Sequence, residues 1–404
     1  MPVGVLVLLG FLVSFGPLSI DMYLPALETI AKDLGAPIDV IQLTLASFFV
    51  GISLGQVFYG PAADRFGRKP PLYFGLLIYA LASALCAVTS NPTLLITLRF
   101  FQAIGSCAGM VVTRAMVRDL FRPEEGAKIF SMLMLVMGAA PILAPSVGGA
   151  VATTFGWRPI FVIQAVAALI CLWRVHESLP ETHGPEKRAL FSGRFSETLR
   201  NYLGILRDRR FMIPAVSGGI AQAGMFAYIT GSPFVLMNLM GLPPGRYAVV
   251  FGCNAVGLIA VSQINRFFVG KFGLERTLAS TFGVIALIGT VFLQFGLSGA
   301  APIPLMSLMS ALFLYVASMG AMFPNSGALA MADQAHIAGS ASALLGTIQM
   351  LIAAVLSGVV SHFHDGTAAP MCLTIAAAGI GSAFVHFAGT WLRNRPLEQA
   401  PKHD

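Results

Sequence analysis

Long apolar runs alternate with short polar segments along the whole chain. Each run is about 20 residues long, the length that a helix needs to cross roughly 30 Å of hydrocarbon. The pattern therefore predicts an all-α membrane protein with twelve transmembrane helices. The first run has no basic leader and no small-residue cleavage site, so we expect a spanning helix there and not a signal peptide. The runs cover residues 3–26, 40–63, 71–88, 94–112, 129–151, 160–175, 213–239, 248–268, 278–297, 303–330, 338–360 and 371–392.

The runs fall into two sets of six. Between the sets lies a polar stretch, 177–210, that is rich in Arg, Lys, Glu and Pro. A short repeat relates the sets, because Arg65-Phe66-Gly67 follows the second run and Lys271-Phe272-Gly273 follows the eighth. Matching positions six spans apart indicate a duplication. We predict two pseudo-symmetric six-helix bundles, residues 1–176 and 211–404, joined by a cytoplasmic linker, 177–210.

Composition excludes a water-soluble domain. The 404 residues are 56% hydrophobic and only 11% charged, too few charges to cover a soluble surface. If the amino terminus is inside, all Lys and Arg residues fall on the inner side except Lys32, Arg158, Arg246 and the span residue Arg99. We therefore expect a multi-pass protein of the bacterial inner membrane with both termini cytoplasmic. The net charge of +7 then reflects topology and not nucleic-acid binding.

Several function classes lack their sequence signals. The chain has no GxxxxGK[ST] loop, so we expect no nucleotide hydrolysis within it. Its five cysteines lie in or beside spans without paired spacing, which predicts neither disulfides nor a metal site. The GxSxG pattern at 51–55 lies in mid-helix, where it favours close helix packing over a catalytic serine. We expect no enzyme activity, cofactor or metal.

Asp21 and Arg99 are the notable charges inside spans. Counting about 1.5 Å per residue, both lie roughly 9 Å below the outer surface. An unpaired charge at that depth is costly, so we expect both side chains to face an aqueous cavity and to serve as counter-ions. Such a carboxylate can carry protons, and this pair is our predicted proton-coupling site. The alternative is that Asp21 only anchors an interfacial helix end, since Pro25 follows four residues later.

The expected cavity walls combine aromatic, Met and amide side chains among aliphatic neighbours. Such a lining suits varied amphipathic molecules better than a sugar, which needs many hydrogen-bonding groups. Each residue taken alone is better explained by packing than by ligand contact, and Gln56 and Asn254 are the stronger candidates because an amide inside a span needs a partner. The predicted cavity residues are Tyr23, Gln56, Gln102, Met225, Phe226, Tyr228 and Asn254.

Several motifs resemble the major facilitator superfamily, and more narrowly its bicyclomycin-resistance (Bcr/CflA) branch of drug/proton antiporters. The similarity extends over nearly all twelve runs. In the family's RxxQG-like element, matched here by Arg99, Gln102 and Gly105 with two residues before the glycine, the arginine is linked to proton transfer. The motifs are GPLSIDMYLPAL at 16–27, GPAADRFGRKP at 60–70, RFFQAIG at 99–105, RAMVRDLF at 114–121 and AGSASALLG at 338–346.

The resemblance also implies a cytoplasmic gate. The segment 60–69 fits the family pattern GxxxDRxGR(R/K), which includes Asp64, Arg65 and Arg68. By resemblance, Asp64 caps the positive end of the eleventh helix near 339–342, and Arg68 pairs with Asp119. The alternative is that the basic residues act only as topology signals.

The fifth run resembles the antiporter signature GPxxGG at Pro145, Gly148 and Gly149. Upstream glycines of that signature are replaced here by Ser131, Ala140 and Ala144. A proline-kinked, closely packed helix explains this segment as well as a direct coupling role does.

The combined hypothesis is a monomeric, proton-coupled exporter of small amphipathic drugs of the bicyclomycin or chloramphenicol kind, working by alternating access. The first alternative is a facilitator or proton symporter of a small metabolite, which would favour a wall rich in polar residues. The second is a non-transporting sensor, which would need a large soluble output segment.

Overall fold

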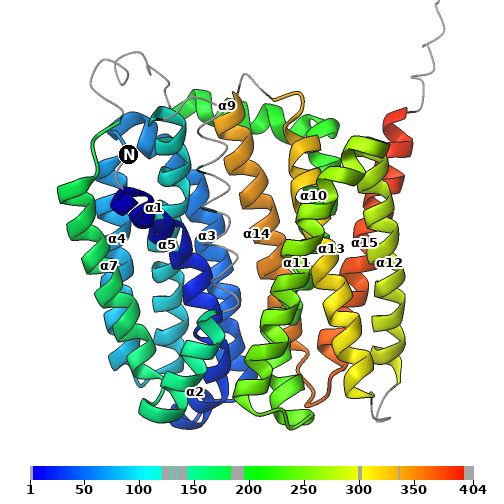
Figure 1. Ribbon diagram of the computed structural model, residues 1–404, viewed down its shortest axis with the longest axis horizontal. Coiled ribbons are helices and arrows are strands. Elements are labelled where there is room, and N and C mark those ends of the chain that lie inside the picture. The colour runs from blue at the N-terminus through cyan, green and yellow to red at the C-terminus, as the bar shows by residue number, and fades with distance from the viewer. Residues whose placement is uncertain are drawn as a thin grey trace, which may run out of the picture.

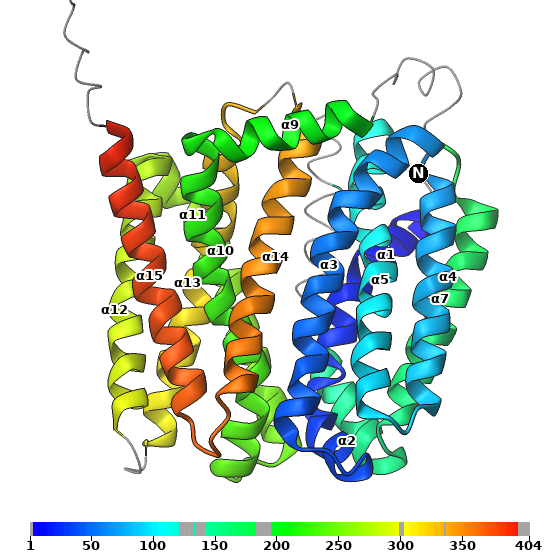
Figure 2. The same ribbon diagram turned by 180° about the vertical axis from the view of Figure 1, so that it is seen from behind.

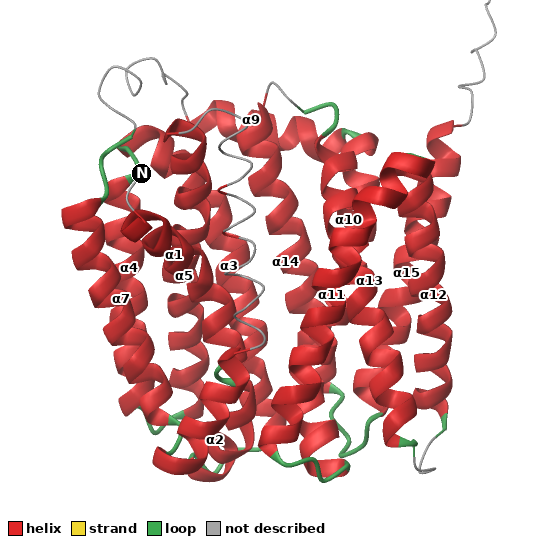
Figure 3. Ribbon diagram, in the orientation of Figure 1, coloured by secondary structure: helices red, strands yellow, loops and turns green. Residues whose placement is uncertain are grey.

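A computed structural model describes residues 3–120, 129, 133, 143–182, 195–298, 303–334 and 337–394, and these residues form helices and loops without a strand (Figure 3). Their helices gather on two sides of the molecule (Figure 1). The first bundle contains α1 (Val3–Asp21), η1 (Leu24–Ala26), α2 (Leu27–Asp33), α3 (Ile38–Phe66), α4 (Lys69–Val88), α5 (Pro92–Leu120), an unlabelled helix (Leu143–Phe155) and α7 (Arg158–Ser178).

The second bundle follows the linker helix α9 (Phe195–Arg207). It contains α10 (Arg209–Ser232), the π-helical turn η2 (Pro233–Leu239), α11 (Pro244–Phe272), α12 (Leu274–Leu297), α13 (Leu305–Met331), α14 (Ala338–His362) and α15 (Ala369–Asn394). The amino-terminal end of α1, the carboxyl-terminal end of α15 and α9 all lie at one end of the molecule, which we call the linker end (Figures 1 and 2). The opposite end, which holds α2, is the α2 end.

The spans agree with the predicted runs. The described residues contain eleven helical segments long and apolar enough to cross a membrane, together with the shorter apolar helix Leu143–Phe155 in the fifth run. Ser131 and Ala140 of that run lie outside the described residues. The all-α membrane architecture therefore matches the expectation from hydropathy.

The first helix differs from its predicted range, because α1 stops at Asp21 and the chain continues through η1 into α2, ending at Asp33. Pro25 explains the break. It has no N–H to donate to the carbonyl of Asp21, four residues earlier, and its ring would collide with that carbonyl. The backbone tightens instead, and the Tyr23 N–H donates to the Ile20 carbonyl at 3.1 Å. The break places Asp21 at the last position of a helix inside the membrane span.

The linker contains a helix that the hydropathy pattern did not indicate. Within it, α9 is a 13-residue helix that buries Tyr202 and Ile205 while Leu203 and Leu206 stay exposed. The helix is too short and too charged to be found in a search for membrane spans.

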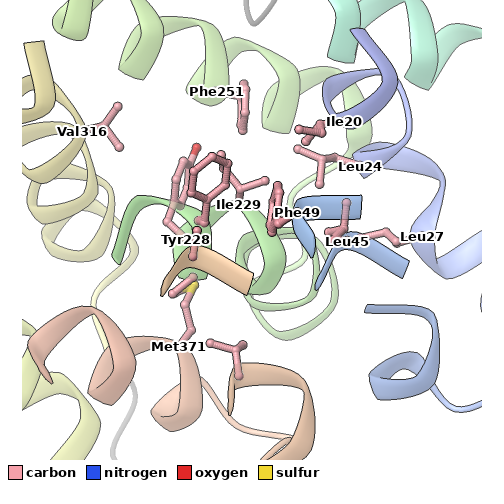
Figure 4. Close-up of a cluster of buried hydrophobic side chains, with 14 of the residues drawn as sticks. Ile20, Leu24, Leu27, Leu45, Phe49, Tyr228, Ile229, Phe251, Val316 and Met371 are labelled. Carbon is pink, nitrogen blue, oxygen red and sulfur yellow. The ribbon is translucent and has the colours of Figure 1, made fainter. Parts of the chain in front are cut away.

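The two bundles meet along α3 and α14. The Ser53 hydroxyl donates to the Thr347 carbonyl at 3.1 Å, and the Thr347 hydroxyl donates to the Ser53 carbonyl at 3.2 Å. Nearer the α2 end, the rings of Phe49 and Phe226 pack with centroids 4.3 Å apart. Figure 4 shows this apolar part of the seam, where Phe49 lies beside Ile229.

Candidate functional site

A cavity of about 220 Å³ lies between the bundles, bounded by α1, α3 and α5 on one side and by α10 and α14 on the other. Asp21 is the one acidic or basic side chain among the described residues that line it. The rest of the wall is mainly apolar and includes three methionines. The lining residues are Val13, Gly16, Pro17, Ile20, Asp21, Ile52, Ser106, Cys107, Met110, Met225, Phe226, Ile229 and Met350.

Asp21 faces the second bundle. Its side chain is buried and lies within electrostatic reach of the Tyr228 and Tyr247 hydroxyls. Both tyrosines are held in place, because the Asn254 amide donates to the Tyr228 oxygen at 2.9 Å and the hydroxyls of Ser232 and Tyr247 are 3.1 Å apart. Asp21 therefore lies near two tyrosines of the second bundle whose positions are fixed by hydrogen bonds.

Arg99 is enclosed inside the first bundle and does not line the cavity. Its guanidinium donates to the Gln102 side-chain oxygen at 2.5 Å and to the Ser19 carbonyl at 3.0 Å. It also lies over the rings of Tyr23 and Phe48, at 4.6 and 4.4 Å from their centroids. Such cation–π contacts stabilise a positive charge without a carboxylate.

The expected ion pair between Asp21 and Arg99 is therefore wrong for this structure, although Arg99 contacts residues on both sides of Asp21 in the chain. Arg99 contacts Ser19 and Tyr23, which lie one helical turn apart on either side of Asp21. Within α1, at about 100° per residue, Asp21 lies about 200° around the helix from Ser19. Arg99, on α5, therefore contacts the side of α1 that is turned away from Asp21.

Two of the predicted cavity residues belong to the Arg99 network instead. The Gln102 amide donates to the Ser83 hydroxyl at 2.7 Å and to the Gln164 oxygen at 2.8 Å. The Tyr23 hydroxyl is 2.9 Å from the Thr44 hydroxyl. Both side chains are fully buried between helices of the first bundle, where polar groups must find partners within the protein.

The other predicted cavity residues divide between three places. Met225 and Phe226 line the cavity with Asp21. Tyr228 and Asn254 form the hydrogen-bonded pair that faces Asp21 and are not among its lining residues. Gln56 lines a separate pocket of about 150 Å³ nearer the linker end.

At the linker end, Arg68 joins two carboxylates. Its guanidinium lies 2.6 Å from Asp64 and 2.8 Å from Asp119, so the pairing expected between Arg68 and Asp119 is present. Burial by itself lowers the pKa of Arg68, but the hydrogen bonds to Asp119 and Asp64 outweigh it and raise that pKa above its usual range. Arg65 is not part of this group, because its side chain is exposed and lies over the Phe66 ring.

Two residues that the sequence did not suggest complete the group. The Glu181 carboxylate accepts hydrogen bonds from the backbone N–H groups of Arg68 and Lys69, at 2.9 and 3.1 Å. These are the first N–H groups of α4, where a negative charge is favourable. The Thr182 hydroxyl donates to Asp119 at 3.0 Å. We call Asp64, Arg68, Asp119, Glu181 and Thr182 the linker-end cluster.

The expected cap of Asp64 on the eleventh spanning helix, α14, is only approached. Asp64 lines the 150 Å³ pocket together with Gly339 and Ser340 in the first turn of α14. Among the described residues, the hydrogen bond of its carboxylate is to Arg68 and not to that turn. The pocket separates the acid from the helix end.

The glycines of the antiporter-like segment pack against the α1 break. A methyl group at Gly148 would overlap the Met22 carbonyl, directly after Asp21, whereas at Gly149 the nearest atom would be Pro25 Cβ at 3.6 Å. Pro145 is buried in the same helix. Gly148 is therefore required where this helix crosses the chain beside the cavity carboxylate.

Two bundles of spanning helices around an internal cavity define a multi-pass membrane transporter and not an enzyme. The chain belongs to the Major Facilitator Superfamily, whose family pattern matches residues 7–358. It is 37% identical to the uncharacterized MFS-type transporter YdgK of Bacillus subtilis, over 93% of this chain and 92% of the relative. It is 30% identical to the bicyclomycin resistance protein homolog of Haemophilus influenzae, over 94% of each chain.

The fold is also that of solved transporters. The crystal structure of a peptide transporter POT in complex with sulfate superposes with a TM-score of 0.72, covering 96% of this chain and 94% of that one. The sequence identity is 16%, so this likeness concerns the fold alone.

Proposed function

We propose that this protein exports small amphipathic, drug-like molecules across the bacterial inner membrane in exchange for protons, with the linker end and both termini in the cytoplasm. A single chain contains both bundles and the cavity between them, so we propose that it works as a monomer. The basic residues near the linker end support this orientation under the positive-inside rule.

The observation that carries the proposal is the single acidic side chain of an otherwise apolar cavity. A carboxylate in such a wall needs a compensating positive charge, and among the described residues Arg99 is turned away from it. A proton supplies that charge in one state, and a cargo molecule that displaces the proton couples the two movements. We therefore assign proton exchange to Asp21.

Arg99 has a different role in this proposal. Because it binds the Ser19 carbonyl and the Tyr23 ring, it holds the end of α1 from the side opposite to the cavity. We propose that Arg99 is a positioning residue that keeps Asp21 directed toward the second bundle. It does not itself exchange protons.

The cargo class follows from the cavity wall. Met110, Met225 and Met350 offer flexible, polarisable surfaces that adapt to varied apolar shapes. A sugar would need more hydrogen-bonding groups than this wall provides. The relative named for bicyclomycin resistance supports a drug-like cargo.

We propose that the ion pairs of Arg68 with Asp64 and Asp119 close the linker end when the cavity opens toward the α2 end. Arg68 and Asp64 line the pocket at the linker end, and Asp64 is 35% exposed, so water can reach these charges when the pairs break during each cycle.

The test is drug-induced release of a preformed, acid-inside pH gradient in inverted membrane vesicles. Bicyclomycin and chloramphenicol are the probes. The parent protein should release the gradient when either drug is added, and Asp21→Asn should slow this release at least about tenfold because the side chain no longer binds a proton. Asp39→Asn, which removes a carboxylate near the α2 end of α3, is the matched control and should release the gradient as the parent does.

Parental exchange by Asp21→Asn contradicts the assignment of proton exchange to Asp21. Movement of protons and drug in the same direction contradicts antiport and favours a proton symporter.

A further inference from the structure

The linker helix α9 crosses the linker end of the molecule and contacts α10 and α14 (Figure 2). Its buried face consists of Tyr202 and Ile205, which pack in one apolar cluster with Phe211 of α10 and Leu344 of α14. Val57 of α3, in the first bundle, packs against the same cluster. This face of α9 therefore packs on the second bundle, in a cluster to which α3 of the first bundle contributes Val57.

The hydroxyl of Tyr202 is buried in this seam. Its side chain is only 8% exposed, and its hydroxyl has no hydrogen-bond partner among the described residues. It lines the 150 Å³ pocket that also contains Asp64, Arg114 and the first turn of α14. The volume is enough for a few water molecules, each of which takes about 30 Å³ in the liquid. A water molecule can therefore bridge the hydroxyl to the carboxylate or to free N–H groups of α14.

The linker is attached at both ends. After α9, the Gln334 amide donates to Asp208 at 2.7 Å and Arg210 pairs with Asp333 at 3.0 Å, which fastens the start of α10 to the segment before α14. Before α9, Glu181 and Thr182 bind the linker-end cluster of the first bundle. Separation of α3 from α14 at this end must therefore move Tyr202 relative to at least one bundle.

The hydroxyl is suited to act as a donor. Burial raises the pKa of Tyr202 and the nearby negative charge of Asp64 raises it further, so the phenol stays protonated at neutral pH.

We propose that Tyr202 is a positioning residue of the linker-end gate, which holds this end closed by filling the seam with its ring and by directing its hydroxyl at Asp64 and the first turn of α14. This inference rests on the proposed gate but not on the identity of the cargo or on proton coupling. Opening of the linker end withdraws the ring from one of the two bundles. Loss of Tyr202 therefore shifts the resting equilibrium toward the form open at the linker end.

The experiment measures that equilibrium directly with cysteine reporters in the full chain, purified in lipid nanodiscs, where both ends are accessible. The background carries Cys253→Ser, because Cys253 is the exposed native cysteine among the described residues. One reporter, Ser342→Cys, lies in the pocket at the linker end, and the other, Leu24→Cys, lies in the apolar seam nearer the α2 end. The probe is N-ethylmaleimide, added without drug or pH gradient.

Tyr202→Phe keeps the ring and removes only the hydroxyl. We expect it to speed labelling at Ser342→Cys about threefold and to slow labelling at Leu24→Cys, since a population shift opens one end while it closes the other. Tyr202→Ala should increase the first rate about tenfold. Leu203→Ala, on the exposed face of α9, is the matched control and should leave both rates unchanged.

Unchanged rates in Tyr202→Phe and Tyr202→Ala overturn the proposal. A rise of both rates together also overturns it, because that result indicates general loosening and not a shift between two states. The labelling uses neither cargo nor protons, so failure of the drug-export proposal leaves this test intact.

Discussion

Two buried arginines in the first bundle, Arg68 and Arg99, are held in opposite ways. Arg68, at the linker end, is paired with two carboxylates. Arg99, inside the span, is held by a carbonyl, an amide and aromatic rings, with no carboxylate within ion-pair distance among the described residues. Both side chains are buried, so burial alone does not decide which groups compensate the positive charge of an arginine.

The two arrangements suit different roles. Arg68 itself is buried, but its partner Asp64 is 35% exposed at the linker-end pocket, so the charges can be hydrated again when the pairs separate, and this suits a gate. A guanidinium that is enclosed by rings and carbonyls within the span cannot be hydrated if its contacts break, so it stays in place and suits a fixed support. Because Arg99 is held by groups other than Asp21, the cavity carboxylate remains available for a proton or a cationic group.

The largest expected effect is the loss of stability when Arg99 is replaced. Arg99→Met leaves the Ser19 carbonyl and the Gln102 oxygen without their donor and removes the cation–π contacts. We expect a loss of about 3 kcal/mol in the free energy of unfolding. The measurement is unfolding of the purified protein in detergent.

Arg114→Met is the matched control for Arg99→Met, because it makes the same change on the same helix, α5. Among the described residues Arg114 makes no hydrogen bond or ion pair, so we expect a change within about 0.5 kcal/mol. Equal stability of Arg99→Met and the parent contradicts the supporting role of Arg99.

A smaller loss of stability is expected at Gly148, where a neighbouring helix packs against the chain beside Asp21. Gly148→Ala introduces a methyl group against the Met22 carbonyl, so the helix or the α1 break must shift. We expect a loss of about 2 kcal/mol in the free energy of unfolding, together with slower proton exchange because Asp21 is displaced. Unfolding in detergent and gradient release in vesicles measure the two effects.

Gly149→Ala is the neighbouring control. Its new methyl group meets an ordinary contact distance of 3.6 Å, so both stability and exchange should stay near parental values. If the two alanine variants behave alike, close packing at Gly148 does not position the carboxylate.

The smallest expected effect concerns the ion pairs at the linker end. Asp119→Asn removes one carboxylate from Arg68, whose pairing with Asp64 remains. Because the side chains of Arg68 and Asp119 are only 7% and 15% exposed, we expect a loss of about 1.5 kcal/mol that changes little with salt. Unfolding in detergent at several salt concentrations is the measurement. A loss that shrinks at high salt indicates a pair open to solvent and contradicts this expectation.

The sequence predicted the depth of the site better than its direction. Depth follows from counting residues from the span ends, and the contacts of Arg99 on either side of Asp21 agree with it. Direction depends on which face of α1 meets which neighbour. For the same reason, Tyr23 and Gln102 were assigned to the cavity but are enclosed within the first bundle.

Functional residues in the linker were also missed in the sequence analysis. Glu181 and Thr182 follow the sixth span without a motif that marks them, and their partners Arg68 and Asp119 are more than 60 residues away in sequence. Tyr202 looks like one aromatic residue in a polar stretch. Its position at the seam appears only when α9 is packed against both bundles.

The sequence by itself determined that this protein lies in a lipid bilayer and where its spans are, because the hydrocarbon thickness sets the length of each apolar run. Its motifs indicated the family and the pairing of Arg68 with Asp119. Only the tertiary structure decided that Asp21 faces the second bundle while Arg99 is enclosed in the first, since the rotation of a helix is set by all the neighbours that pack around it. The linker's attachment to the gate was decided in the same way, by contacts between segments far apart in sequence.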